Sequence, residues 1–125
     1  MLSDKNAIAN IAVKDLEKAK GFYQDVPGLQ QIGSNAHEVI VFKSGNSMIN
    51  VYKSQYTGTN KATSMTWTVG DNIEEVVKAL KGKGITFEHY NMPNITLDGD
   101  IHVDGKMKVA WFKDPDGNIL NLINT

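Results

Sequence analysis

Side chains able to carry metal or acid–base chemistry are few in this chain and widely spaced. It holds three histidines, His37, His89 and His102, and no cysteine, so thiol nucleophiles, disulfides, zinc–thiolate sites and iron–sulfur clusters are excluded. Glu88 and His89 are neighbours in a segment expected to be a strand, so their side chains would point to opposite faces. A His/Glu metal cluster would therefore have to draw on unrelated strands.

The other residues that could support catalysis form no recognised motif. We expect His37 at the start of a strand, where it either reaches a site or lies exposed at the strand end. We expect His102 beside the Asp104-Gly105 turn, in contact with solvent. The sequence has no Gly-x-Ser-x-Gly nucleophile elbow. Gly82-Lys83-Gly84 follows a predicted helix instead of opening one, which is the wrong order for a phosphate-binding loop.

Length and charge limit the kinds of partner. The chain has 125 residues and a formal net charge of −1, which predicts one domain without the basic patch that nucleic acid or an anionic membrane would need. Polar residues interrupt the N-terminal apolar run of Met1 to Lys14, unlike a secretory signal. No segment approaches the roughly 18 apolar residues of a spanning helix. We expect a soluble, cytoplasmic protein.

The first half of the sequence predicts a strand, a helix and three further strands. Asp15 is a helix N-cap candidate, and apolar residues follow it at helical spacing until Val26-Pro27-Gly28. Short runs of β-formers are separated by turn residues. The expected strands are Ala7–Val13, Leu29–Ile32, His37–Phe42 and Ser47–Tyr52.

The second half predicts the same order again. Asp71 with Glu74 resembles a capping box, and the helix that follows is the most amphipathic in the chain. A loop is expected around Met92-Pro93-Asn94, and Asp114 to Asn118 has the residues of a hairpin turn. The expected strands are Ser64–Val69, Ile85–Tyr90, the segments flanking Asp104-Gly105, Val109–Phe112 and Ile119–Ile123.

The two halves also align residue by residue. Val13-Lys14-Asp15 matches Val69-Gly70-Asp71 at an offset of 69 − 13 = 56 positions. Phe42-Lys43-Ser44 matches Phe112-Lys113-Asp114 at 112 − 42 = 70. This pattern indicates an internal repeat, although any two units of this kind would share some capping and turn residues.

These segments, above all Phe112 to Asn118, resemble those of the vicinal oxygen chelate superfamily, which includes glyoxalase I, extradiol dioxygenases and bleomycin-resistance proteins. The resemblance implies an α+β fold with two βαβββ modules, whose curled mixed sheets surround a concave site. The single domain would span residues 1–125, with module one at about 5–54 and module two at about 62–125.

The resemblance also implies where metal ligands would stand. Histidines of the first strand of each module fall at Ile8 and Ser64, and carboxylates of the last strands at Asn50 and Asn121. An aliphatic side chain, a hydroxyl and two amides lack the imidazole and carboxylate groups that hold Zn²⁺, Fe²⁺ or Mn²⁺. We therefore expect neither a metal nor a cofactor at these positions.

Strand alternation assigns faces to the same positions. In Ser64–Val69 the residues Met65 and Trp67 form the apolar face and should pack beneath the helix. The opposite, polar face should line the concavity. The candidate ligand-binding residues are Asn10, His37, Asn50, Tyr52, Ser64, Thr66, Thr68, Trp111 and Asn121, although Tyr52 and Trp111 suit ordinary sheet packing equally well.

These observations predict a homodimeric protein that binds a small organic molecule and sequesters a drug or metabolite. A cationic drug would favour a more acidic groove than this near-neutral chain offers. The alternative is a lyase, isomerase or dioxygenase-like enzyme with relocated or non-standard active-site residues. A third possibility is a protein-interaction module whose concavity is filled by its own side chains.

Overall fold

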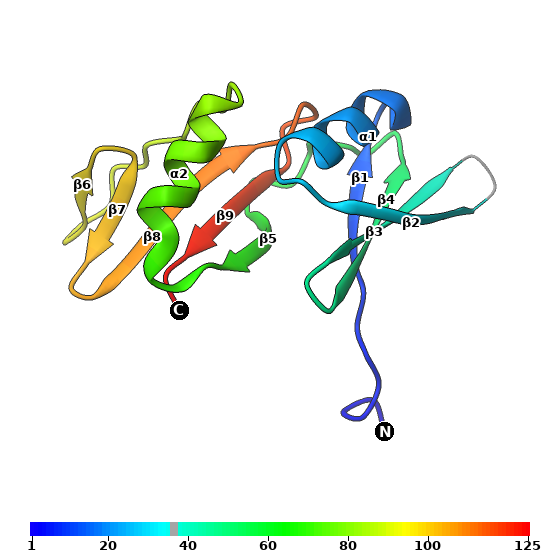
Figure 1. The fold of residues 1–125 in the computed structure, drawn as a ribbon, viewed down its shortest axis with the longest axis horizontal. Coiled ribbons are helices and arrows are strands. Elements are labelled where there is room, and N and C mark those ends of the chain that lie inside the picture. The colour runs from blue at the N-terminus through cyan, green and yellow to red at the C-terminus, as the bar shows by residue number, and fades with distance from the viewer. Residues whose placement is uncertain (36–37) are drawn as a thin grey trace. The chain divides into compact units, whose positions relative to one another are not determined.

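A computed structural model describes residues 1–35 and 38–125 of the chain, which divide into unit 1, residues 1–59, and unit 2, residues 60–125 (Figure 1). His37, one of the predicted site residues, lies outside the described residues. Among the described helices, none is long and apolar enough to cross a membrane.

Unit 1 is a four-stranded mixed sheet with one helix. The strand order is β1-β4-β3-β2, in which β1 runs parallel to β4 and the other neighbours are antiparallel. The elements are β1 (Ala9–Val13), α1 (Leu16–Asp25), β2 (Gln30–Asn35), β3 (Val39–Ser44) and β4 (Ser47–Lys53).

The helix of unit 1 begins where the sequence predicts. The carboxylate of Asp15 accepts hydrogen bonds from the backbone N–H groups of Glu17 and Lys18, at 3.0 and 3.3 Å, which satisfies donors that the first turn leaves free. Tyr23 of α1 is fully buried and packs against Phe42 of β3, with ring centroids 5.9 Å apart. One face of the sheet is therefore covered by the helix.

Unit 2 repeats this arrangement with a sheet of five strands. The order is β5-β9-β8-β7-β6, with β5 parallel to β9 and the remaining pairs antiparallel. The elements are β5 (Thr63–Thr68), the 3-10 helix η1 (Gly70–Asn72), α2 (Ile73–Gly82), β6 (Thr96–Asp98), β7 (Ile101–Asp104), β8 (Met107–Lys113) and β9 (Ile119–Ile123). The predicted class, α+β with two βαβββ modules in mixed sheets, is confirmed.

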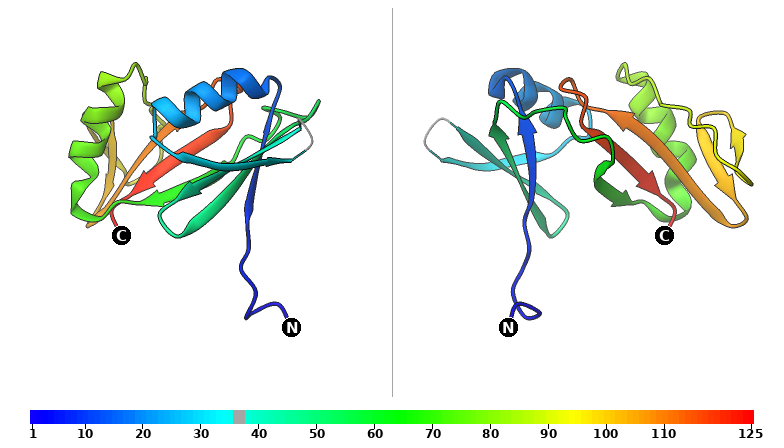
Figure 2. Two further views of the ribbon diagram at one scale, coloured as in Figure 1. Left: turned by 45° about the vertical axis from the view of Figure 1, so that its right-hand side comes forward. Right: turned by 180° about the vertical axis from the view of Figure 1, so that it is seen from behind.

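The helix α2 covers one face of the unit 2 sheet. In Figure 1 it lies in front of β8 and β9, and seen from behind in Figure 2 the sheet lies in front of the helix. Its residues Ile73, Val77 and Leu80 are buried. Trp67 is half-buried and stacks on the buried ring of Phe112, with ring centroids 6.2 Å apart, so it lies on the predicted apolar face at the margin of the core.

The turn between β8 and β9 is held together by one buried carboxylate. Asp114 Oδ1 accepts from the backbone N–H groups of Asp116 and Asn118, both at 2.9 Å, and its Oδ2 accepts from Asn118 Nδ2 at 2.8 Å. Gly117 takes a positive φ of 87°, which glycine tolerates without strain. The turn predicted from sequence is confirmed.

One strand prediction for unit 2 is wrong. The predicted strand Ile85–Tyr90 is reduced to one bridge, in which the Glu88 N–H donates to the carbonyl of Trp111 at 2.8 Å. The reason is competition: β7 pairs with the same edge of β8, so only one position remains for Glu88. The loop predicted around Met92-Pro93-Asn94 is confirmed. It leads into β6, a strand that the sequence did not predict, and β6 turns into β7 at Gly99, whose φ is 62°.

The predicted capping box is also wrong. Asp71 lies inside η1, and Asn72 is the N-cap of α2. Within the described residues, no side-chain hydrogen bond caps α2. The 3-10 turn of η1 takes the place of the cap because it continues directly into the helix.

Candidate functional site

In each unit, the sheet face opposite the helix carries the predicted polar residues. In unit 1 the parallel register places Asn10 opposite Asn50 and Ala12 opposite Tyr52, and paired residues share one side of a sheet. Asn50 Nδ2 donates to Asn10 Oδ1 at 3.4 Å. Asn10 is exposed, and Asn50 and Tyr52 are half-buried. The structure thus brings these three predicted residues onto one face.

The corresponding face of unit 2, which we call the polar face, has the same register. Thr66 of β5 lies opposite Asn121 of β9, which in turn lies opposite Trp111 of β8. Thr68 occupies the next position along β5 on this face, opposite Ile123. Thr66, Thr68, Trp111 and Asn121 are therefore brought together as neighbours.

Ser64 does not follow the simple alternation that the sequence suggests. Thr63 pairs with Ile119 and Met65 pairs with Leu120, so Ser64 is the additional residue at a register shift. Thr63 takes its place on the polar face, where its Oγ1 accepts a hydrogen bond from Trp111 Nε1 at 3.1 Å. Sequence reasoning missed Thr63 because a bulge shifts the phase of the strand.

Asn121 occupies an unusual environment for an amide. Its side chain is 8% exposed, and its Oδ1 is buried with no hydrogen-bond partner among the described residues. A buried polar atom left unpaired costs about 1–3 kcal/mol. An atom of this kind commonly marks a position where a ligand or a water molecule completes the hydrogen bonding.

Aromatic residues surround Trp111 beside this amide. The ring of His102 meets the indole edge-on at a centroid distance of 4.8 Å, and the ring of Tyr90 does so at 5.3 Å. The rings of Tyr90 and His102 are themselves 6.0 Å apart. We call Tyr90, His102 and Trp111 the aromatic cluster.

The prediction that His102 is solvated is wrong, since the side chain is 2% exposed. The chain after Glu88 leaves the sheet edge and packs against His102: the backbone N–H of Tyr90 donates to His102 Nε2 at 2.9 Å. β7 is only four residues long, and the contact joins residues 12 apart in sequence. No pattern of neighbouring residues could therefore predict the burial of His102. Tyr90 and His102 are thus site candidates found only in the structure.

Two polar atoms of the aromatic cluster are buried in the same way as Asn121 Oδ1. Tyr90 Oη and His102 Nδ1 are buried and have no hydrogen-bond partner within the described part of the chain. Three polar atoms without a partner among the described residues therefore belong to side chains grouped around one indole.

The metal ligands of the family do not fit this chain. Ile8 precedes β1 and is 40% exposed, while Asn50, Ser64 and Asn121 offer only amide and hydroxyl groups. Within residues 1–35 and 38–125, no three His, Cys, Asp or Glu side chains are grouped so as to hold a metal ion. The donor set lacks the negative charge that a divalent catalytic ion requires.

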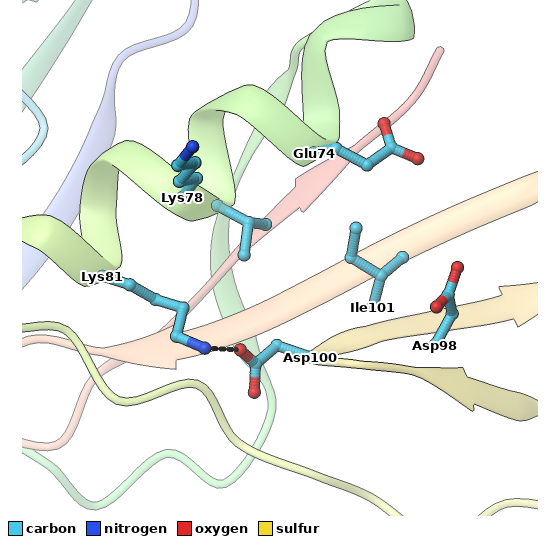
Figure 3. Close-up of a pocket in the computed structure, with 7 residues that line it drawn as sticks. Glu74, Lys78, Lys81, Asp98, Asp100 and Ile101 are labelled. Atoms are coloured by element: carbon cyan, nitrogen blue, oxygen red, sulfur yellow. Dashed lines mark ion pairs between the residues drawn. The ribbon is translucent and has the colours of Figure 1, made fainter.

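A separate pocket of about 310 Å³ lies between α2 and the β6–β7 hairpin (Figure 3). Lys81 of α2 pairs with Asp100 at 2.7 Å, and His89 contacts the other oxygen of Asp100, also at 2.7 Å. The hydrogen bond from Lys81, and then that from His89, lowers the pKa of Asp100. These charges hold the helix, the hairpin and the segment before Tyr90 together.

A second ion pair joins the helix to the sheet near this pocket. Glu74 of α2 contacts Lys108 of β8 at 2.6 Å, and this hydrogen bond lowers the pKa of Glu74 and raises that of Lys108. The pocket lies on the helix side of the sheet, away from the polar face. We therefore assign its charges a structural role.

Comparison with known proteins gives one family. The model of the Glyoxalase/Bleomycin resistance protein/Dioxygenase superfamily matches residues 6–122. No curated protein matches the chain.

Several solved structures share the fold. An integron cassette protein from the mobile metagenome of the Halifax Harbour sewage outfall is 18% identical, with a TM-score of 0.72, and the match covers 98% of this chain and 99% of that one. A mutant of the fosfomycin resistance protein FosX from Listeria monocytogenes, in complex with Mn(II) and dihydroxypropylphosphonic acid, is 18% identical, with a TM-score of 0.73 and coverage of 99% and 91%.

Lactoylglutathione lyase from Agrobacterium tumefaciens is similar to the same degree. It is 20% identical, with a TM-score of 0.71, and the match covers 98% of this chain and 95% of that one. At such identities the likeness extends to the fold alone.

Proposed function

Because the chain belongs to the Glyoxalase/Bleomycin resistance protein/Dioxygenase superfamily, we propose that it binds a small, partly apolar organic molecule without the aid of a metal ion. The single observation that carries this proposal is Asn121. Its amide stands where the family resemblance implies a carboxylate, and its buried Oδ1 has no partner among the described residues. A ligand N–H or O–H group would satisfy it.

The surroundings of Asn121 suit such a ligand. Trp111 and Thr66 flank the amide on the polar face, one with an aromatic surface and the other with a hydroxyl. Binding sites for small organic molecules combine apolar walls with a few placed polar groups. By analogy with drug-sequestering relatives, the expected role is sequestration of a drug or metabolite by a homodimer.

Native mass spectrometry of the protein purified from its host tests this proposal. We expect an adduct with the mass of a small organic molecule, and the loss of most of that adduct in Asn121→Leu, which has a similar shape but no acceptor. The control is Asn46→Leu in an exposed turn of unit 1, which should keep the adduct. The same spectrum reports the oligomeric state, and a monomer would contradict the homodimer.

Calorimetric titration with Mn²⁺, Zn²⁺ and Fe²⁺ tests the metal-free part. We expect no tight binding, because amide and hydroxyl groups cannot replace imidazole and carboxylate ligands. Uptake of one ion per chain with micromolar or tighter affinity would overturn it.

A further inference from the structure

We propose that the aromatic cluster and Asn121 form one recognition site for a planar ligand group that carries both a hydrogen-bond acceptor and a donor, as a primary aromatic amide does. This inference rests on the proposed function, since it names the ligand chemistry of the same polar face. It goes further by giving Tyr90, His102 and Trp111 defined roles in binding.

The first role follows from the protonation of His102. A backbone N–H group can only donate, so the 2.9 Å bond from Tyr90 N makes His102 Nε2 an acceptor. In a neutral imidazole the proton then lies on Nδ1. Because Nδ1 is buried and unpaired within the described residues, His102 offers a fixed donor that is ready for an acceptor atom of a ligand.

The second role belongs to Asn121, which offers the opposite polarity. Its Oδ1, which has no partner in the described part of the chain, can only accept. Tyr90 Oη likewise has no described partner and can both donate and accept. A ligand group with a carbonyl oxygen beside an N–H would complement His102 and Asn121 together, whereas a lone carbonyl or a lone amine would complement only one of them.

The third role belongs to Trp111, which contacts both rings of the cluster and is half-buried. The unpaired atoms are shielded from solvent in this structure, so a ligand must displace a side chain to reach them. Trp111 lies next to Tyr90, His102 and Asn121. Its Nε1 donates a hydrogen bond to Thr63 Oγ1. Rotation of this indole would open the site and provide an aromatic wall for a planar ring.

Fluorescence titration of the Trp67→Phe variant with benzamide tests the inference. The chain has two tryptophans, and this substitution leaves Trp111 as the single indole that reports binding. Benzamide carries the acceptor, the donor and the planar ring. We expect a saturable change in Trp111 emission with a Kd on the order of 1 mM, which is ordinary for so small a ligand. Acetophenone, which keeps the carbonyl and lacks the N–H, should bind about tenfold more weakly.

Two substitutions of His102 separate recognition from structural support. In His102→Gln the side-chain carbonyl can take the position of Nε2 and accept from Tyr90 N–H, but the Nδ1 donor is lost. In His102→Asn the side-chain amide can take the position of Nδ1 and donate, while the bond to Tyr90 is lost. We expect His102→Gln to lose about tenfold in benzamide affinity at unchanged stability, and His102→Asn to lose stability and keep affinity better.

Three outcomes would overturn the inference: no saturable response to benzamide, equal binding of benzamide and acetophenone, or unchanged affinity in both His102→Gln and Tyr90→Phe. None of them touches the proposed function, which depends on the native adduct and its loss in Asn121→Leu. If that adduct is absent while benzamide binds as described, the recognition site stands and the sequestration role fails.

Discussion

In unit 1, Asn10 lies opposite Asn50 and the two amides bond to each other close to solvent. In unit 2, Thr66 lies opposite Asn121, whose buried oxygen is left without a partner among the described residues. At these positions the strand register is equivalent in the two units, so the register does not cause the difference. Unit 2 differs because the segment after α2 and the additional strand of its five-stranded sheet place the aromatic cluster beside Asn121.

This difference teaches that an internal repeat can preserve a scaffold while only one copy acquires a buried site. A solvated amide pair costs little and specifies little, whereas a desolvated unpaired group costs stability and selects its partner. The predictions below test whether the two units differ in this way.

The largest expected effect lies in the last hairpin of unit 2. Asp114→Ala removes a buried carboxylate that accepts three hydrogen bonds, so the free energy of unfolding should fall by about 3 kcal/mol. The control is Asn46→Ala in the exposed turn of unit 1, which should change it by less than about 0.5 kcal/mol. Urea denaturation measures both. Equal losses would mean that the two turns do not differ.

Removal of the unpaired hydroxyl of Tyr90 should stabilise the protein. Tyr90→Phe deletes a buried Oη that has no partner among the described residues, which should raise the free energy of unfolding by about 1 kcal/mol. Tyr52→Phe, on the corresponding face of unit 1, should leave it unchanged within about 0.5 kcal/mol. A loss of stability in Tyr90→Phe would show that the hydroxyl is already bonded in the free protein.

The ion pair of Asp100 should make unit 2 sensitive to acid. The pKa of Asp100 is lowered by Lys81 and then by His89, so its contribution is present above the carboxyl's ordinary value of 3.8 and is lost as pH falls through the folded pKa. Asp100→Asn should reduce stability at pH 7 by at most about 1 kcal/mol, and the difference from the native protein should shrink toward pH 2. Urea denaturation across this range measures it. A constant difference would contradict the assignment.

The smallest expected effect lies in the amide pair of unit 1. Asn50→Ala removes one 3.4 Å hydrogen bond to an exposed partner, so stability should change by about 0.5 kcal/mol or less. Asn121→Leu should instead raise stability, by about 1 kcal/mol, because it removes a buried oxygen that no described residue contacts through a hydrogen bond. A clear loss in Asn50→Ala would mean that the unit 1 pair is also a buried site.

The sequence alone determined the features that depend on neighbouring residues. Asp15 caps α1, the amphipathic run from Ile73 forms α2, and Asp114 to Asn118 closes the last hairpin. The repeat was also readable: Asn10 and Thr66 differ by 66 − 10 = 56 positions, as predicted from the strand ends, and each lies opposite its own asparagine. Capping, periodicity and turn chemistry act within a few residues, so they survive without knowledge of the fold.

Only the tertiary structure decided the environment of the candidate site. Glu88 forms one bridge instead of the predicted strand because β7 pairs with the edge of β8. Thr63, and not Ser64, lies on the polar face because the register shifts between Thr63 and Met65. His102 is buried because Tyr90, distant in sequence, packs against it. Competition for a sheet edge and burial by a remote segment are long-range effects, and no pattern in the neighbouring residues encodes them.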